Sequence, residues 1–522
     1  MEICTGAGHK LSTCRNPVKA LYRRYAVIAL AVGCAAVLGV GCAVGPNYKP
    51  PAQHMPATWV APPTTQASTT VQEPLEVERW WTTFNDPELD SLVRRAVRAN
   101  LDIQLASERI VQARAVLGVT EAGFFPTVDA NGSYTRSFSA KGGGVVITSG
   151  AGGTGTITGG GSTTTVKPHA HDNWQAGLNA AWQLDIFGGI RRSIEAATAT
   201  WESQIENRRD VLVRTLASVA SDYITLRGFQ QQIKIAQENL QSQIHNAEVT
   251  RKKVQGGTTT GLDVANADAQ VASTRAQLAG FESLAQQEIY AISVLLGEEP
   301  AELVAELRPT GNIPLTPPVV PVGLPSELLR RRPDIRAAER QLASATAQIG
   351  VATADLFPKF SLTGTLTTSG PRYQSIGNWG TRFWSFGPSA SWAIFDAGAI
   401  WSNIAVQNSL QRQALLTYRQ TVLLALQDVE DSLTAYAQEQ QRRAALADSV
   451  AANQRAVKLA TEQYQAGVTD FLNVLVAEQS LYSSQNALVQ SNQAVATDLV
   501  AIYRSLGGGW AIGEAPATQP AQ

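Results

Sequence analysis

The chain has 522 residues, which at roughly 150 residues per domain corresponds to three or four structural units. Its 42 Lys and Arg residues are balanced by 43 Asp and Glu residues, and a net charge of −1 argues against a nucleic-acid-binding surface. All four cysteines lie within the first 42 positions, so the rest of the chain has neither a disulfide framework nor a thiolate zinc site. No nucleophile elbow, zinc-protease motif or phosphate loop occurs, and we expect neither an enzyme nor a bound cofactor or metal.

One long apolar run, Tyr25–Gly41, follows four basic residues between positions 15 and 24. A basic stretch, an apolar run and small residues before Cys42 are typical of an export signal, which we place at residues 1–41. A single membrane-spanning anchor is the alternative, because about 17 apolar residues is the lower limit for crossing a bilayer. Residues 42–79 then form an N-terminal extension outside the cytoplasm.

An internal repeat organises the rest of the chain. Asn100–Val128 matches Arg332–Phe360, and Trp174–Gly297 matches Trp384–Gly507 at an offset of 210 positions. The first copy alone carries a Gly-, Ser- and Thr-rich insertion, Lys141–Thr165, which is typical of a flexible loop. The repeat predicts two halves of the same architecture. The expected units are a first repeat at 80–297, a linker at 298–323, a second repeat at 324–507 and a tail at 508–522.

Each half is expected to run helix, strand, loop, strand, long helix, tight turn and shorter helix. Apolar residues recur at every seventh position from Leu212 to Val254, and the second half repeats the pattern from Val422 to Tyr464. A sustained seven-residue repeat predicts a supercoiled helix that packs against neighbouring helices. A helix spanning 191–255 would be about 98 Å long at 1.5 Å per residue. Polar residues interleave with its apolar stripe, so we expect it to lie in water rather than in lipid.

Four segments alternate apolar and polar residues with the period of a strand. They are Val128–Phe138, Trp174–Ile186, Phe360–Thr367 and Trp384–Ile394. Their length and their two-sided pattern suit a transmembrane barrel, whereas a half-buried soluble sheet is the alternative for any one of them. Arg136 interrupts an apolar stripe and is expected at headgroup level. Pro388 cannot donate a ladder hydrogen bond, so a bulge or another irregularity is predicted there.

Four strands cannot close a barrel by themselves. An open sheet edge in lipid leaves unpaired backbone groups that cost several kcal/mol each. Closure needs at least about eight strands, so two copies would supply 8 strands and three copies 12. An eight-stranded barrel is filled by its own side chains, and the polar inner faces of these strands therefore favour the trimer.

Five segments in this order resemble the outer-membrane factors of Gram-negative efflux systems, the TolC-like channels, and specifically their NodT-type lipoprotein branch. The segments are GCAVGPNYKPP (Gly41–Pro51), WWTTFNDPELDSLVRRAVRAN (Trp80–Asn100), WQLDIFGGIRR (Trp182–Arg192), LPSELLRRRPDIRAAER (Leu324–Arg340) and WAIFDAGAI (Trp392–Ile400). The resemblance implies an α+β membrane protein with an internal two-fold structural repeat. It implies a homotrimer whose 12-stranded transmembrane β-barrel, with four strands per chain, continues into a 12-helix periplasmic α-barrel.

The resemblance also implies a function and its partners. The chain would be the passive exit duct of a tripartite efflux system, taking small molecules or drugs from a proton-driven inner-membrane pump through a periplasmic adaptor, or membrane-fusion, protein. It would lie among outer-membrane lipids and extend into the periplasm, without nucleic acid. Cys42 matches the lipid-modified cysteine of the family, so residues 1–41 would be a lipoprotein signal peptide and Cys42 a lipid anchor.

The two helix-to-helix turns hold the candidate working residues. Gly257 and Gly467 suit the left-handed residue that ends a helix. The resemblance implies that the hairpin tips converge into a periplasmic gate. Its candidate residues are Asp263, at an acidic gate position, Tyr464, in a gating network, Leu472, in an apolar ring, and Asp470, Asn473 and Val476 beside them. Helix capping by itself also explains Asp263 and Asn473. Thr469 stands where the family has a basic partner.

Two other functions remain open at this point. The same fold can serve as a type I protein-secretion exit duct. A trimeric coiled-coil adhesin or structural spacer belongs to another class, and the two return hairpins with matched tips argue against it.

Overall fold

The computed structural model describes residues 43–52, 55–60, 77–139, 169–314 and 325–510. These residues form two compact units, each described here by itself. The first unit contains the strands and comprises the residues up to Asn47, Gly118–Glu195 and Ala347–Asn408. The second unit is helical and comprises Tyr48–Leu117, Ala196–Thr346 and the residues from Ser409 onward. The predicted signal segment, Cys42 and the insertion at 141–165 lie outside the described residues.

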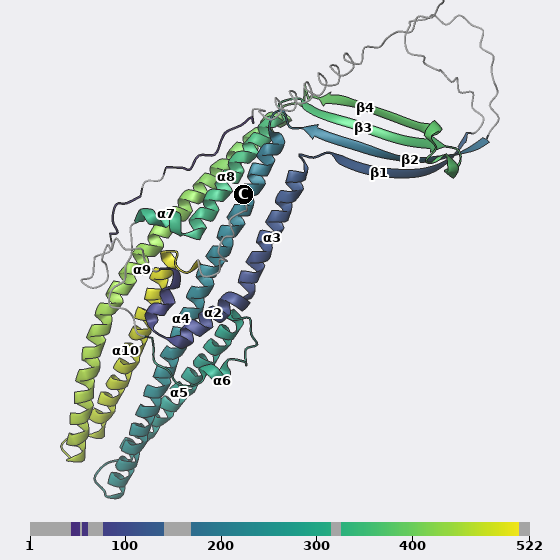
Figure 1. Ribbon diagram of the computed structural model, residues 1–522. Coiled ribbons are helices and arrows are strands. Elements are labelled where there is room, and N and C mark those ends of the chain that lie inside the picture. Colours follow the sequence, from purple (N-terminus) through teal and green to yellow (C-terminus); the bar gives the residue numbers. More distant parts are fainter. Residues whose placement is uncertain (1–42, 53–54, 61–76, 140–168, 315–324, 511–522) are drawn as a thin grey trace, which may run out of the picture. The chain divides into compact units, whose positions relative to one another are not determined.

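From α3 in the first half and from α8 in the second, both halves of the chain contain the same elements in the same order, which confirms the predicted succession (Figure 1). The first half has α2 (Pro87–Ala99), α3 (Leu101–Ala122), β1 (Thr127–Ser139), β2 (His169–Leu184), α4 (Gly189–Gln255) and α5 (Gly261–Leu295). The second half has α8 (Pro333–Ala354), β3 (Lys359–Gly370), β4 (Arg382–Ser391), α9 (Ala399–Gln465) and α10 (Phe471–Ser505). Short elements are η1 (Val77–Phe84), α6 (Val304–Leu307), η2 (Pro325–Glu327), α7 (Leu328–Arg331), η3 (Tyr373–Ser375) and η4 (Trp379–Thr381).

The helices that follow the strands have the same lengths in the two halves. Helices α4 and α9 have 67 residues each, and α5 and α10 have 35 residues each. At 1.5 Å per residue each long helix extends for about 100 Å. No helix in the described part of the chain combines the length and the apolar composition that a bilayer span requires.

The four strands form one antiparallel sheet in the order β1-β2-β3-β4. The register aligns residues of like polarity across all four strands. One apolar row is Ala130, Leu178, Leu366 and Trp384, and the next row, on the opposite face, is Asp129, Asn179, Thr365 and Ser385. Side-chain hydrogen bonds between neighbouring strands run along the polar face, as between Thr365 and Ser385 at 2.8 Å. The predicted division into an apolar and a polar face is therefore confirmed.

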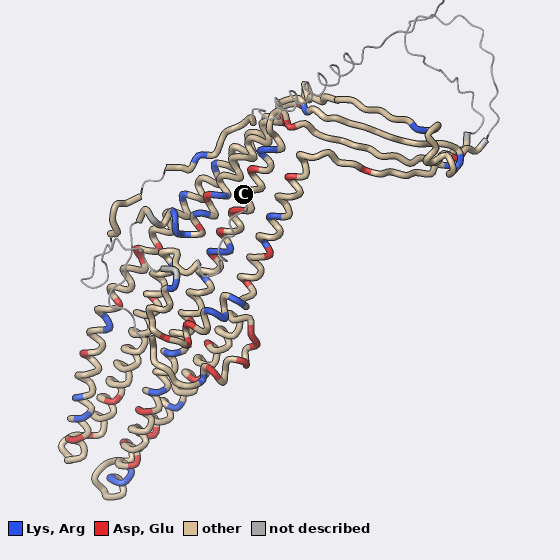
Figure 2. Tube along the Cα trace, viewed as in Figure 1, with Lys and Arg blue, Asp and Glu red and all other residues tan. Residues whose placement is uncertain are grey.

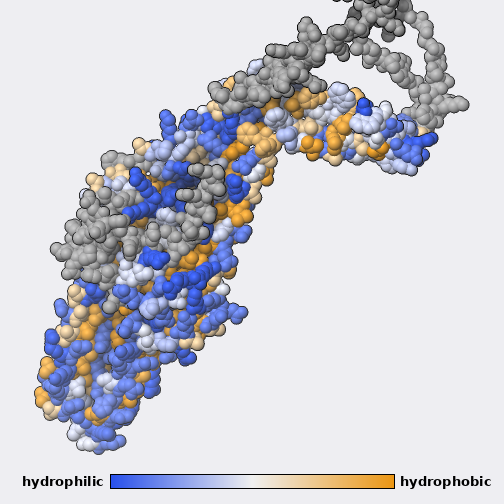
Figure 3. All heavy atoms as spheres, viewed as in Figure 1, coloured by the Kyte–Doolittle hydropathy of each residue, from blue (hydrophilic) through white to orange (hydrophobic). Residues whose placement is uncertain are grey.

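The apolar face of the sheet is exposed in the single chain. Large exposed side chains on it include Val128, Tyr134, Phe138, Leu178, Leu366, Trp384 and Phe386, and orange apolar patches lie among white and blue areas over the sheet in Figure 3. Charged residues gather on the helices and are few on the strands (Figure 2). Arg136 forms an ion pair of 3.7 Å with Asp172 on the neighbouring strand, close to the end of β1.

The bulge predicted at Pro388 is wrong. Pro388 pairs with Leu362 in a register that continues without interruption from Lys359 opposite Ser391 to Thr368 opposite Arg382. In an antiparallel pair, alternate N–H groups point away from the partner strand. β4 lies at an edge of the sheet, so a proline whose missing N–H would face away from β3 removes no hydrogen bond between these two strands.

The helical unit has its core where the start of the first half packs against the long helices. Trp80 stacks on Tyr503 with ring centroids 5.5 Å apart, and α2 buries its apolar side on the same cluster. Asp86 caps α2 by accepting hydrogen bonds from the N–H groups of Glu88 and Leu89. The buried members from α2 and α4 include Leu89, Leu92, Val93, Ala96, Leu212, Leu216, Tyr223, Ile224 and Leu226.

The described part of the linker, 298–314, is fastened to α4 by two polar side chains. Arg227 donates to the carbonyl oxygen of Pro309 at 2.9 Å, and Gln230 donates to that of Leu307 at 2.7 Å. Gln230 also accepts from the N–H of Gly311 at 3.1 Å. Irregular backbone in contact with a buried helix face needs such partners, because its polar groups would otherwise lose their hydrogen bonds to water.

Candidate functional site

Each pair of long and shorter helices is joined by a tight turn with the same backbone geometry. Gly257 and Gly467 have φ of +72° and +74°. The N–H that follows each glycine donates back across the end of the helix at 2.9 Å, from Thr258 to the Lys253 carbonyl and from Val468 to the Gln463 carbonyl. This arrangement satisfies carbonyls that a helix end leaves free, and it needs a residue without Cβ in the left-handed region.

The two turns start their second helices differently. The Asp263 carboxylate accepts hydrogen bonds from the Thr259 hydroxyl and from both the N–H and the hydroxyl of Thr260, at 3.3 and 3.1 Å. The Thr259 hydrogen bond is the largest effect that lowers the pKa of Asp263 below its usual value. At the second turn, Asp470 precedes α10 without a side-chain capping bond, and Asn473 donates to the Thr469 hydroxyl at 2.6 Å. Asp263 is thus a charged cap in the first hairpin.

Tyr464 lies inside the chain, between the two hairpins. Its side chain is 6% exposed, its hydroxyl donates to Thr250 of α4 at 3.3 Å, and its ring lies 5.4 Å from that of Phe471. The small apolar cluster around it consists of Ala247, Ala267, Tyr464, Phe471 and Val474. The residue joins the end of α9 to the end of α4, and the structure brings none of the other candidate gate residues into this cluster.

Lys253 of the first hairpin makes a second contact with Tyr464 of the second hairpin. Its ammonium group donates to the carbonyl oxygen of Tyr464 at 2.6 Å and lies 3.9 Å from the centre of the tyrosine ring. A cation is favourable both beside a carbonyl near a helix C-terminus and over an aromatic face. Arg251, two residues earlier, forms an ion pair with Asp268 of α5. The basic group that the resemblance places in the second turn is thus absent at Thr469, and the first hairpin supplies one from three consecutive basic residues at 251–253, at the end of α4.

Leu472 and Val476 lie one turn apart on α10 and are exposed, at 58% and 53%. Leu262, in the first turn of α5, and Val468, in the second hairpin turn, are also exposed. The tips therefore carry apolar side chains that no other part of the described chain covers, whereas Tyr464 is covered. Asp470 and Asn473 are exposed as well.

Above the tips, polar side chains join the two hairpins. Asn246 of α4 donates to Glu478 of α10 at 2.5 Å, and Gln479 of α10 donates to Gln270 of α5 at 2.9 Å. Burial raises the pKa of the Glu478 carboxyl above its ordinary value. Hydrogen bonds between side chains of neighbouring helices fix which residues lie opposite one another.

Each hairpin also carries a pair of neighbouring carboxyl groups, in which Glu288 and Asp498 occupy equivalent positions of the repeat and their partners do not. Burial and, to a smaller extent, the Asp222 carboxylate raise the pKa of Glu288 in the first hairpin. Burial and the Glu439 carboxylate raise the pKa of Asp498 to about 6 in the second hairpin. Like charges in partly desolvated places each disfavour ionisation of the other group.

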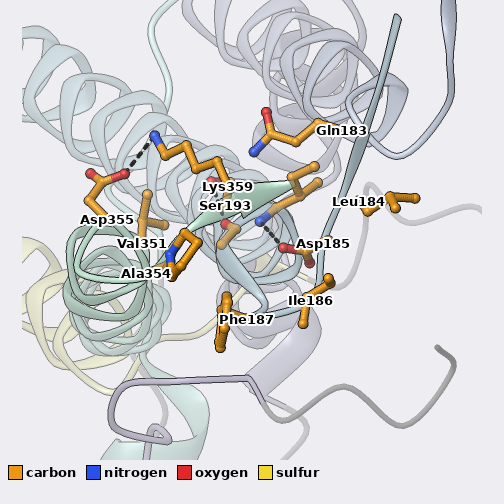
Figure 4. Close-up of a pocket in the computed structure, with 13 residues that line it drawn as sticks. Gln183, Leu184, Asp185, Ile186, Phe187, Ser193, Val351, Ala354, Asp355 and Lys359 are labelled. Atoms are coloured by element: carbon orange, nitrogen blue, oxygen red, sulfur yellow. Dashed lines mark hydrogen bonds and ion pairs between the residues drawn. The ribbon is translucent and has the colours of Figure 1, made fainter. Parts of the chain in front are cut away.

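A separate cavity of about 170 Å³ lies in the strand-containing unit, where β2 leads into α4 and α8 leads into β3 (Figure 4). The charged groups that line it are already engaged. Lys359 forms an ion pair of 2.8 Å with Asp355, and Asp185 accepts hydrogen bonds from the first turn of α4. Among the described residues, no group of three or more His, Cys, Asp or Glu side chains could hold a metal ion. The tips of the hairpins are therefore the stronger candidate site.

Comparison with known proteins gives a consistent assignment. The family model described as outer membrane efflux protein matches residues 92–298 and 324–508. Nodulation protein T of Rhizobium leguminosarum bv. trifolii is 32% identical over 471 residues, which covers 90% of this chain and 95% of that protein. The probable efflux pump outer membrane protein TtgC of Pseudomonas putida KT2440 is 31% identical over 486 residues, covering 93% and 96%. The solved structure of the outer-membrane channel OprN is similar at a TM-score of 0.80 and 35% identity, and covers 90% of this chain and all of that one.

Asp498→Asn is expected to raise the thermal midpoint of the purified protein at pH 8 by about 1–2 °C and to have no effect near pH 4. With a native pKa of about 6 against an ordinary value of 3.8, the folded state binds the proton more tightly, and the stability of the wild type falls as pH rises through this interval. The measurement is a melt followed by circular dichroism at both pH values. In protein that already carries Glu439→Gln, Asp498→Asn should raise the midpoint at pH 8 by less, because the Glu439 carboxylate contributes to the raised pKa of Asp498. An equal shift of the midpoint at both pH values would contradict the assignment.

Proposed function

The chain belongs to the outer membrane efflux protein family, and on this premise we propose that it is the passive exit duct for small molecules in a tripartite efflux system. The family is made of channel proteins, so the chain is a channel and not an enzyme. The observation that carries the proposal is the match of both halves of the chain to the family model, together with a sheet whose apolar face is exposed. Transport through such a duct requires opening of the helix tips and diffusion, with no chemical step.

The proposed assembly is a homotrimer with a 12-stranded barrel that continues into a 12-helix tunnel. Its support is the sheet itself. The chain supplies four described strands, and β1 and β4 each have one side without a partner strand in the sheet. In lipid those backbone groups need hydrogen bonds, and identical copies provide them when β4 of one copy pairs with β1 of the next. The exposed apolar side chains then face lipid, and the polar rows line the lumen.

A trimer is the expected species in mild detergent. The free edges of β1 and β4 are both paired only when the barrel is closed, and the proposed barrel closes with three copies. The mass from multi-angle light scattering should therefore be three times that of the chain. Truncation of the β3–β4 hairpin (359–391) removes half of the strands and should abolish the trimer. A stable single protomer, with the four-stranded sheet retained, would contradict the proposed assembly.

Three further parts of the proposal concern the surroundings of the duct. Cys42, outside the described residues, would carry the lipid anchor in the outer membrane. A periplasmic adaptor protein would bind the helical end and connect it to an inner-membrane pump driven by protons. The named relatives support an efflux assignment, since TtgC is described as an outer membrane protein of an efflux pump.

The proposed gate lies at the hairpin tips. Asp263, Asp470, Asn473, Leu472 and Val476 are at or near the surface there, as a constriction between copies requires. Tyr464 differs, because it is buried between the hairpins of one chain. We assign to Tyr464 the role of coupling the second hairpin to the first, while the exposed apolar pair on α10 closes the pore. Gly257 and Gly467 form the turns around which each tip is built.

Leu472→Gly is expected to raise the single-channel conductance in planar lipid bilayers at least about twofold, because an apolar constriction blocks ions by excluding water. Leu262→Gly is the matched control, since Leu262 is the equivalent exposed residue of the first hairpin. An equal increase in both variants would show general loosening of the helix starts, and no increase in Leu472→Gly would contradict the assignment.

Two substitutions of Asp263 separate its charge from its capping role in the same bilayer assay. Asp263→Asn keeps an acceptor for the threonine donors, whereas Asp263→Ala removes it. If the charge belongs to the gate, both variants lose cation selectivity. If Asp263 only caps α5, Asp263→Ala alone changes the channel, which would remove this residue from the proposed gate.

Deletion of the gene is expected to increase accumulation of a fluorescent drug in the cells severalfold, because the duct is the exit of the pump. Restoring the wild-type chain should restore export, and restoring a chain without the 359–391 hairpin should not. The competing function, a type I protein-secretion duct, predicts instead the loss of a secreted protein from the medium with normal drug accumulation. That outcome would overturn the proposed cargo while leaving the channel assignment in place.

A further inference from the structure

The segment that directly follows Cys42 is held by one buried side chain, Arg192 at the start of α4. Arg192 is 4% exposed. Its Nε donates to the carbonyl oxygen of Val44 at 3.0 Å, and one terminal nitrogen donates to the Gly45 carbonyl at 3.2 Å and to the Asn47 side-chain oxygen at 2.7 Å. The other terminal nitrogen binds Glu195 at 2.7 Å. A guanidinium group presents its donors in a fixed plane, so all of these acceptors must be in place at once.

The backbone beside Arg192 adds a further hydrogen bond. The N–H of Val44 donates to the carbonyl oxygen of Phe187, in the corner between β2 and α4, at 3.1 Å. Asp185 holds this corner by accepting from the N–H groups of Ile190 and Arg191, each at 3.0 Å. The segment 43–47 is therefore attached to a corner that is itself fixed, at the end of the sheet where the strands lead into helices.

Three glycines make room for this segment. A Cβ at Gly45 would lie 2.4 Å from the Gly350 backbone, one at Gly188 would lie 2.6 Å from the Ala43 backbone, and one at Gly350 would lie 2.7 Å from Cγ of Arg192. Gly45 and Gly188 also have positive φ. Contacts this close are possible only where side chains are missing, so the fit between the segment and the corner depends on backbone approach.

The internal repeat shows that these features are particular to this segment. The position equivalent to Gly188 is Gly398, whose φ is also positive, and the position equivalent to Gly350 is Gly118. A Cβ at Gly398 or at Gly118 would meet nothing within 4 Å. Ser402 replaces Arg192 in the second half. The same backbone corner thus occurs twice in the chain, and only the first copy carries the arginine and the close contacts.

We propose that Arg192 is the positioning residue of the lipid anchor, which fixes where the acylated amino terminus leaves the protein. This inference rests on the proposed acylation of Cys42. Cys42 is covalently bonded to Ala43, and Ala43 contacts the corner at Gly188. The acyl chains would then start beside the end of the strands, where a barrel in the outer membrane meets its inner leaflet. If the segment 43–47 is held at the corner, the acyl anchor fixes the position of the sheet along the bilayer normal. If the segment were free, the sheet could lie at many positions relative to the bilayer.

The first test is hydrogen exchange of the full-length protein in detergent, measured by mass spectrometry on the peptide that covers 43–48. Arg192→Ala should exchange at the Val44 amide at least about tenfold faster than the wild type, because the opened segment loses its hydrogen bond to Phe187. Gly350→Ala should show a smaller increase by displacing the arginine side chain. Gly118→Ala is the matched control, a helical glycine at the equivalent repeat position, and should exchange like the wild type. Wild-type exchange in Arg192→Ala would overturn the inference.

The second test asks whether Arg192 acts through the anchor. Arg192→Ala should lower the yield of assembled trimer in outer membranes about two- to threefold when Cys42 is acylated, because a loosened tether lowers the effective concentration of the strands at the bilayer. The same substitution should have no further effect in Cys42→Ser protein exported behind a non-lipoprotein signal. An equal loss in both backgrounds would mean a purely structural role and would overturn the inference.

The mass of the N-terminal peptide separates this inference from the proposed anchor. A wild-type peptide that carries acyl groups on Cys42 supports both. A wild-type peptide without acyl groups overturns the anchor and the positioning role together, and the exchange contrast between Arg192→Ala and Gly118→Ala then still reports whether the segment is docked. If Cys42 is acylated and the peptide covering 43–48 exchanges its amide hydrogens at the same rate in all variants, only the role of Arg192 is overturned.

Discussion

Hydrogen bonding along the two outer strands is the constraint on which the proposed architecture depends. β1 and β4 each present backbone donors and acceptors on one side that the four-stranded sheet does not satisfy. Water can satisfy them, but lipid cannot. A chain whose sheet exposes an apolar row on one face and a polar row on the other therefore fits a closed barrel of several copies.

The internal repeat supplies two equal frameworks, and side chains then make them unequal. α4 and α9 have the same length and end in the same glycine turn, yet the second hairpin has Tyr464 where the first has Val254. The buried tyrosine and Lys253 from the other hairpin link the two tips of one chain. At the opposite ends of these helices, Arg192 holds the N-terminal segment and its counterpart, Ser402, does not. The two halves thus share a backbone architecture, and residues that differ at equivalent positions, such as Tyr464 and Val254, give each half its own contacts.

The helical unit combines an apolar core near α2 with polar contacts nearer the tips. Around Trp80 the packing is dense and aromatic, and it fixes the first half of the chain against the second. Nearer the tips, by contrast, Asn246 donates to Glu478 and Gln479 donates to Gln270. The hairpins are therefore joined there by side-chain hydrogen bonds and by the small apolar cluster around Tyr464.

The sequence by itself determined the succession of elements, the two-fold repeat, the two faces of the sheet and the glycine turns, because each depends on local periodicity or on the φ angle of one residue. Tertiary structure alone decided which side chains meet. Lys253 and Tyr464 are far apart in the chain, as are Arg192 and Val44, and no spacing rule relates them. The same reason explains the wrong bulge at Pro388. Whether a missing N–H breaks a ladder depends on which neighbour that N–H would face, and only the order of the strands in the sheet decides this.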